Sequence, residues 1–130
     1  MAKRKRRINA KGRNDTEQYL PIPYSMANHP TFRSLSGPAV KVWIELRSKF
    51  NGSNNGKLSL SFQDAATKLG LSKTTVGRAF NELQEKGFIV KQKAGHWYGR
   101  KAAEYQITDK PYNGSTATRS WQQWRAPKER

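Results

Sequence analysis

Residues 62–81, FQDAATKLGLSKTTVGRAFN, contain two short amphipathic segments joined at a glycine. Ser61 comes just before this stretch and is followed three residues later by Asp64, a capping-box pattern that starts a helix. Gly70 should end that helix, because glycine takes the left-handed backbone conformation easily. The inner face of the helix is predicted to be Ala65, Ala66 and Leu69. The stretch therefore predicts a helix, a sharp turn and a second helix.

The second helix of the pair is predicted over residues 72–86. Ser72 is a good N-cap residue, and Gly87 is the expected left-handed stop. One apolar stripe, at positions i, i+4 and i+7, consists of Val76, Phe80 and Leu83. The opposite face of this helix is polar and basic, so we expect it to remain outside the core.

Alternating apolar residues on both sides of the helix pair predict three short strands. They are Leu58, Leu60 and Phe62 in the first strand, Phe88, Ile89 and Val90 in the second, and Ala103, Tyr105 and Ile107 in the third. Ala94-Gly95 is a turn signal between the last two strands, which we expect to form a hairpin.

A further helix is predicted over residues 35–50. Ser36-Gly37-Pro38 starts it, with proline in the first turn, where its missing N–H is not needed. The expected inner face is Ala39, Trp43, Leu46 and Phe50, broadened by Val40 and Ile44. Residues 19–24 alternate apolar side chains with two prolines and should run extended over the surface of the domain.

The chain is strongly basic. It has 130 residues, and its 25 Lys and Arg residues outnumber nine acids, which gives a formal net charge of +16. Such a charge favours a polyanionic partner, because contacts with phosphates release condensed counterions. Membrane surfaces are also anionic, so charge by itself leaves both nucleic acid and lipid open.

Other features exclude several classes. The absence of cysteine excludes disulfides and cysteine-based metal sites. No apolar run reaches the roughly 20 residues of a membrane span. No hydrophobic segment follows the basic residues 3–7, as it would in a signal peptide, so we expect a cytoplasmic, nucleoid-associated protein.

The stretch from Phe62 to Asn81 resembles the helix-turn-helix motif of bacterial and phage regulators. That motif has a small residue in its first helix, a glycine four positions later and a β-branched residue six beyond that. Ala66, Gly70 and Val76 occupy these positions. The Gly87-Phe88-Ile89-Val90 sequence after the third helix is similar to the winged variety, in which a β-hairpin flanks the recognition helix.

The resemblance implies an α+β fold, a three-helix winged helix-turn-helix with a short first strand, a C-terminal β-hairpin wing and basic tails. Helix 35–50 with its proline-containing lead-in is similar to replication-initiator and mobile-element winged-helix proteins. We expect a basic flexible arm over residues 1–18, the domain over 19–110 and a basic tail over 111–130. In that tail, Trp121 and Trp124 should dock through a short helix onto the domain or a second subunit; stacking on unpaired bases is the alternative.

In this family the third helix enters the major groove, which makes its outward face the candidate DNA-binding site. We expect Arg78 to recognise a guanine edge and Asn81 an adenine edge, and Gly77 to let the helix backbone approach the groove floor. Thr75 should contact a phosphate or face solvent. The candidate DNA-binding residues are Ser72, Lys73, Thr74, Thr75, Gly77, Arg78 and Asn81 in the helix, Lys91, Lys93, Arg100 and Lys101 in the wing, and Lys3, Arg4, Lys5, Arg6 and Arg7 in the arm.

Plainer interpretations compete with these. Lys73 and Arg78 could form a solvated helix face, and the basic residues of the wing and arm could serve solubility alone. Trp97 and Tyr98 could insert toward a minor groove, but packing of the hairpin on the core is the simpler alternative.

Nothing in the sequence indicates catalysis, a metal site or a cofactor, so we expect a protein that is not an enzyme. His29 and His96 are too few and too far apart in sequence for a metal site. Glu82 and Glu85 are expected to be surface acids. The prediction is a sequence-specific double-stranded DNA-binding protein, a transcriptional regulator. A homodimer on a palindrome follows from the resemblance alone. The alternatives are a replication-initiation or mobile-element accessory protein, an RNA-binding winged helix, and a protein-interaction module that uses the wing.

Overall fold

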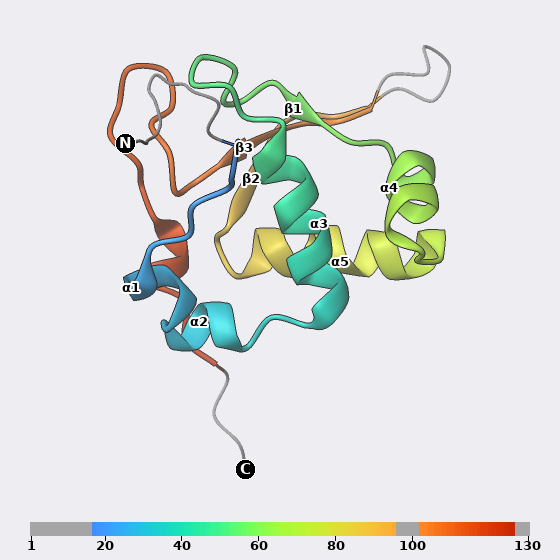
Figure 1. The fold of residues 1–130 in the computed structure, drawn as a ribbon, viewed down its shortest axis with the longest axis horizontal. Coiled ribbons are helices and arrows are strands. Elements are labelled where there is room, and N and C mark those ends of the chain that lie inside the picture. The colour runs from blue at the N-terminus through green and yellow to red at the C-terminus, as the bar shows by residue number, and fades with distance from the viewer. Residues whose placement is uncertain (1–16, 96–101, 127–130) are drawn as a thin grey trace, which may run out of the picture.

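The computed structural model describes residues 17–95 and 102–126. Three longer helices and a small sheet make up the domain, with short helices at both ends of the chain (Figure 1). In chain order the elements are α1 (Tyr24–Ala27), α2 (Pro30–Arg33), α3 (Gly37–Ser48), β1 (Leu58–Ser59), α4 (Phe62–Leu69), α5 (Lys73–Glu85), β2 (Ile89–Lys93), β3 (Glu104–Ile107) and the 3-10 helix η1 (Ser120–Gln122). This is the α+β winged-helix arrangement that the sequence predicts.

Helix α3 begins where the sequence predicts and packs across α5 (Figure 1). The Ser36 hydroxyl accepts a hydrogen bond from the Ala39 N–H, and Pro38 lies in the first turn. Its buried stripe is Ala39, Val42, Trp43 and Leu46, together with Arg47.

The buried face of α3 is narrower than the sequence predicts. Ile44 is 42% exposed, and Val40 and Phe50 are only half-buried. The stripe at spacings of three and four is narrow, and Val42 rather than Ile44 completes it.

The sheet is antiparallel with strand order β1-β3-β2, so the first strand pairs with the third. Ile89 pairs with Ile107 and Lys91 with Tyr105, and a register shift between Lys91 and Lys93 then bends the ribbon. The prediction that Phe62 belongs to the first strand was wrong. Phe62 is the first residue of α4, because the Ser61 cap ends the extended backbone one residue earlier.

The core is rich in aromatic rings. The rings of Phe62, Phe80 and Tyr105 form a continuous stack, with neighbouring centroids 5.2 and 5.0 Å apart, and so join α4, α5 and β3. Trp43 on α3 is fully buried, edge-on to Phe32 at 5.7 Å. Burial of this apolar area is the main stabilising contribution to a domain of this size.

The N-terminal segment is extended up to Pro23, with Leu20 and Ile22 packed against the core. Tyr24, expected at the end of this extended run, instead opens α1. The short helices α1 and α2 were not foreseen, because four-residue helices carry no recognisable periodicity.

The C-terminal segment packs onto the domain through its short helix η1. Trp121 lies in η1 and is fully buried, stacked on Phe88 at 5.9 Å and edge-on to His29 at 5.0 Å. Asn55 holds the start of this segment by donating to the carbonyls of Ile107, Lys110 and Pro111. The expected docking of Trp121 through a short helix onto the domain is confirmed.

Candidate nucleic-acid interface

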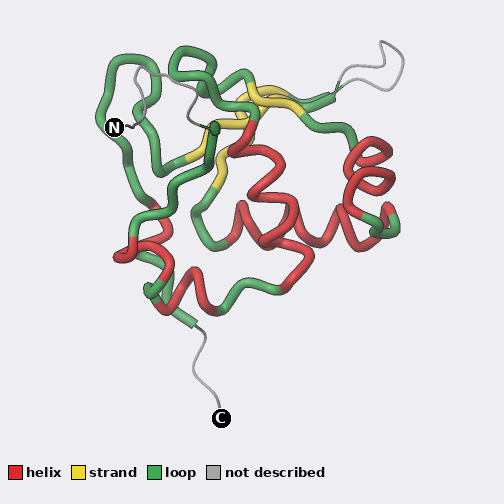
Figure 2. The backbone as a smooth tube through the Cα atoms, viewed as in Figure 1, coloured by secondary structure: helices red, strands yellow, loops and turns green. Residues whose placement is uncertain are grey.

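The turn between α4 and α5 is built by a glycine and a cap. Gly70 has φ 69° and ψ 38°, the left-handed conformation, and the Leu71 N–H donates to the Ala66 carbonyl. Figure 2 shows the two helices joined by this short loop at one end of the molecule. The predicted bend at Gly70 is present, and it sets the direction in which α5 leaves the turn.

The N-terminus of α5 is closed by hydroxyl groups. The Ser72 Oγ accepts from the Thr75 N–H at 3.1 Å and donates to the Thr75 Oγ1 at 2.9 Å. Ser72 is exposed and Thr75 half-buried. Both of these candidate residues therefore have a structural role in the helix cap.

The outward face of α5 is polar and exposed. Val76, Ala79, Phe80 and Leu83 are buried against the domain. Lys73, Thr74, Arg78 and Asn81 are all exposed, and the last three follow one another at spacings of four and three. Residues at these spacings share one side of a helix, so Thr74, Arg78 and Asn81 lie together on a single surface.

Gly77 lies on the flank of this surface rather than at its centre. It is half-buried, and a Cβ built on it would lie 3.4 Å from the Phe62 ring. Phe62 itself is 44% exposed. The exposure of this ring could not be predicted, because the position of Phe62 in an alternating apolar pattern indicated burial.

Two acidic side chains of the domain form ion pairs with basic residues outside α5. Glu45 pairs with Lys68, and Asp109 with Arg47. Within the described part of the chain, no acidic oxygen lies within 4.0 Å of the Lys73 or Arg78 nitrogens. Their charges are therefore available to a ligand.

Glu82 is the acid for which the expectation failed. It joins α5 to the start of α3, because its carboxylate accepts from the Ser36 N–H at 3.0 Å and from the Ser36 hydroxyl at 2.7 Å. Lys86 donates to the same carboxylate at 2.9 Å and to the Ser34 carbonyl at 3.0 Å. Partial burial acts to raise the pKa of Glu82, but the hydrogen bonds from Ser36 and Lys86 outweigh it and lower the pKa below its ordinary value of 4.5.

The strand part of the wing projects from the domain. Only Ile89 of β2 is buried, and Lys91 and Lys93 are exposed. The free ends of β2 and β3 extend toward the end of the molecule that holds α4 and the start of α5 (Figure 1). Outside the described residues lie the candidates Arg100 and Lys101, the aromatic pair Trp97 and Tyr98, and the arm residues Lys3, Arg4, Lys5, Arg6 and Arg7.

The geometry and the family comparison agree. Residues 59–90, from the end of β1 to the start of β2, match the winged helix-turn-helix DNA-binding family. The fold and this match together indicate a winged helix-turn-helix DNA-binding domain within the chain. No curated protein and no solved structure matches the chain.

The described residues contain neither a candidate membrane span nor a candidate metal cluster. None of their helices combines the length and the apolar character needed to cross a membrane. In the same ranges, 17–95 and 102–126, no three His, Asp or Glu side chains gather to hold a metal ion.

Proposed function

We propose that this protein binds specific double-stranded DNA sequences and regulates transcription, with α5 as its recognition helix and with no catalytic role. The observation that carries the proposal is the exposed, polar face of α5, where Lys73 and Arg78 have no acidic partner among the described residues. An α-helix with its side chains is about 10–12 Å across, so it fits the major groove of B-DNA, which is about 12 Å wide.

The N-terminal half of α5 is the part that enters the groove. Lys73, Thr74 and Arg78 are concentrated there, whereas the exposed Glu85 lies at the opposite end and would be repelled by phosphates. The free N–H groups of the first turn add a positive end to the helix dipole, which favours a nearby phosphate.

The side chains divide into two roles. Arg78 contacts a guanine edge and Asn81 an adenine edge, and each such pair is worth about 1–3 kcal/mol of discrimination. Lys73 and Thr74 contact bases or phosphates at the start of the helix, while Ser72 and Thr75 shape the cap and offer hydroxyls to the backbone.

The wing and the arm extend the footprint. Lys91 and Lys93, exposed on β2, contact the phosphate backbone beside the groove. We include Arg100 and Lys101 of the wing, and Lys3, Arg4, Lys5, Arg6 and Arg7 of the arm, in the same electrostatic role. The protein acts in this way on cytoplasmic, nucleoid DNA.

Selection of bound duplexes from a random pool tests the proposal and supplies the site. On the selected duplex, Arg78→Ala should reduce the preference for the correct base. Lys93→Ala should weaken binding to selected and scrambled duplexes alike, and it should reduce the slope of log affinity against log salt concentration by the contribution of about one phosphate contact. Equal losses on both duplexes for the two variants would contradict this division of roles.

Two comparisons separate the alternatives. A symmetric selected site with half-sites about 34 Å apart indicates a homodimer. Structured RNA should compete poorly at matched salt, because the major groove of A-form RNA is too narrow for α5. Mapping the bound sites in the genome distinguishes a regulator, found at promoters, from a replication-initiation or mobile-element protein, found at origins or element ends.

A further inference from the structure

Two loops meet at one end of the sheet, away from the proposed DNA-binding face. Leu58 at the start of β1 pairs with Tyr105 on β3, and the two strands are antiparallel. The loop before β1, residues 49–57, therefore lies at the end of the sheet where β3 stops and the segment 108–119 begins. Figure 1 shows both loops on the opposite side of the molecule from α4, whereas the free ends of β2 and β3 extend toward α4.

Two asparagines connect the basic residues of these loops. The Asn54 Nδ2 donates to the Lys49 carbonyl at 2.9 Å, and the Lys57 N–H donates to the Asn54 carbonyl at 3.0 Å. The Asn55 Nδ2 donates across to the Lys110 carbonyl at 3.2 Å. The backbones that carry three lysines are thus joined by hydrogen bonds, although the lysines are far apart in sequence.

A fourth basic residue reaches the same end of the sheet. The Arg119 N–H donates to the Thr108 carbonyl at 2.8 Å, so the chain returns there to the end of β3. Lys57 and Arg119 are exposed, and Lys49 and Lys110 are half-buried. We call these residues the loop surface: Lys49, Lys57, Lys110 and Arg119.

The charges of the loop surface are not balanced by nearby acids. Residues 46–63 and 110–126 contain no Asp or Glu. Asp109 is the acid nearest in sequence, but its side chain is 7% exposed and is paired with Arg47 at 3.2 Å. None of the ion pairs formed by the described residues involves the loop surface. Its positive charges are therefore available to an anionic partner.

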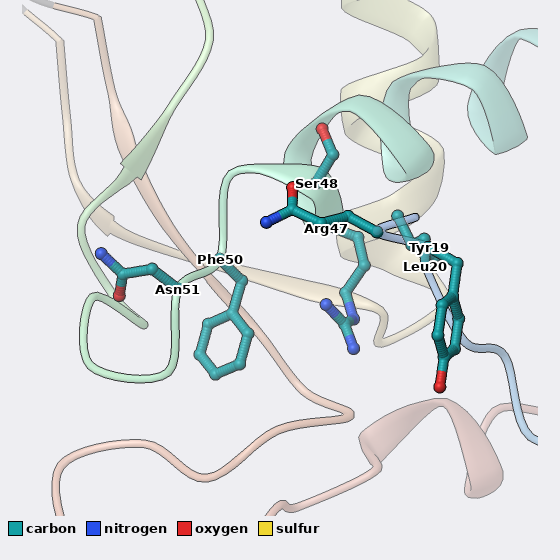
Figure 3. A pocket seen from close by; sticks show the side chains of 7 residues that line it. Tyr19, Leu20, Arg47, Ser48, Phe50 and Asn51 are labelled. Carbon is teal, nitrogen blue, oxygen red and sulfur yellow. The ribbon is translucent and has the colours of Figure 1, made fainter. Parts of the chain in front are cut away.

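The same loop also offers neutral donors. Figure 3 shows the Arg47 guanidinium between the Tyr19 and Phe50 rings, whereas Asn51 lies beyond Phe50. The exposed Asn51 accepts from the Ser53 N–H and hydroxyl with its side-chain oxygen, which leaves its amide N–H groups as donors. Cations together with amide and hydroxyl donors are the groups that contact the phosphates of DNA, and such contacts carry no sequence information.

We propose that the loop surface binds the phosphate backbone of a second DNA duplex, so that one protein molecule bridges two duplexes. The first duplex lies on the α5 face, and this part rests on the proposed function. The four residues of β3 separate the two ends of the sheet by about 10 Å. That distance exceeds the Debye length of about 8 Å at physiological ionic strength, so a duplex at one end leaves the charges at the other end effective.

A bridging assay with the full chain tests the proposal. The selected duplex is immobilised on beads, the protein is bound to it, and capture of a labelled scrambled duplex is measured. The double variant Lys57→Glu, Arg119→Glu should bind the immobilised duplex within about threefold of the wild type but capture the second duplex at least about tenfold less. Both side chains are exposed, so folding should be retained, which urea unfolding checks. The neutral pair Lys57→Gln, Arg119→Gln should give an intermediate loss.

The matched control removes the same charge elsewhere. Arg33 at the end of α2 and Arg125 after η1 are both exposed, and α2 packs against η1. The variant Arg33→Glu, Arg125→Glu should capture the second duplex within about twofold of the wild type, because salt screens charges at that distance from the loop surface. An equal loss in this control would reduce the effect to net charge and overturn the proposal.

Two further results would overturn it. Capture that the Lys57→Glu, Arg119→Glu variant retains would assign bridging to a dimer or to another segment. Tighter binding to phosphatidylglycerol vesicles than to the scrambled duplex, lost in the same variant, would assign the loop surface to a lipid.

The loop surface can be tested even if the proposed function fails. The scrambled duplex is then titrated directly into the Lys73→Ala, Arg78→Ala protein, whose α5 face lacks its two cations. Addition of Lys57→Glu and Arg119→Glu to that protein should weaken duplex binding at least about tenfold. Unchanged binding would exclude the loop surface as a DNA contact, whatever the result for α5.

Discussion

At Gly77 the stability of α5 and its approach to DNA make opposite demands. A glycine within a helix is about 1 kcal/mol less favourable than alanine, and the space at Gly77 accepts a methyl group 3.4 Å from the Phe62 ring, an ordinary contact. We therefore expect Gly77→Ala to raise the free energy of unfolding by up to about 1 kcal/mol, as measured by urea denaturation.

The same variant should bind the selected duplex slightly less tightly, because the added methyl group lies against the exposed Phe62 ring at the flank of the proposed interface and enlarges that flank. A variant that is both more stable and fully active in duplex binding would show that Gly77 has no part in the interface. A variant that is less stable would show that the Phe62 ring cannot adjust.

Two glycines that end helices offer a matched pair of changes. Gly70 and Gly87 both have positive φ, 69° and 86°, and both were predicted from the sequence as helix stops. A Cβ at Gly70 would meet open space, whereas one at Gly87 would lie 2.8 Å from backbone atoms of Ser120 and Trp121. The second glycine thus does more than end a helix, because the C-terminal segment packs directly on it.

We expect Gly70→Ala to cost about 1 kcal/mol, the backbone strain alone, and Gly87→Ala to cost clearly more. Denaturant unfolding of both variants measures the difference. Equal losses would mean that the contact between Gly87 and the Ser120–Trp121 backbone has no energetic weight.

The joint between α5 and α3 should depend on pH. Because hydrogen bonds from Ser36 and Lys86 lower the pKa of Glu82, its contribution to stability is complete above 4.5 and is lost as the pH falls through the lowered pKa. Glu82→Gln should cost about 1 kcal/mol at neutral pH, and the deficit relative to the wild type should shrink in acid. A deficit that stays constant from pH 7 to the acid limit of folding would exclude the carboxylate as its source.

Elements with strong local signals could be predicted from the sequence. The caps at Ser36, Ser61 and Ser72 and the stop at Gly70 lie where the residue types indicate, because a cap is a local hydrogen bond. The polar face of α5 followed directly from removal of its apolar stripe.

Features that depend on distant partners could not be predicted in this way. Ile44 and Phe62 have residue types that indicate burial, yet nothing in the fold covers them fully. Glu82 has the residue type of a surface acid, but Ser36 and Lys86 engage it.

At the scale of the whole molecule, the positive charge extends through both the domain and the segments around it. Residues 111–130 carry four of the basic residues and one acid, yet their first part also completes the core. The C-terminal segment therefore serves folding as well as electrostatics. Its polar composition did not indicate the folding role, whereas its two tryptophans did.

The two tryptophans of that segment separate its roles. Trp121 is fully buried against Phe88 and His29, whereas Trp124 is half-buried with the Lys86 ammonium 5.0 Å from its ring centre.

Trp121→Ala should lower the free energy of unfolding by about 3–5 kcal/mol, the range for loss of a large buried ring. Trp124→Ala should lower it by about 1 kcal/mol, the size of a partly exposed cation–π contact. Ending the chain at residue 110 should destabilise it at least as much as Trp121→Ala, since Phe88 and His29 would then lose the ring that packs on them. Urea unfolding of the three proteins checks this order. If Trp121→Ala instead keeps its stability but loses affinity for single strands, the ring acts as a stacking platform and the packing that we describe for it is wrong.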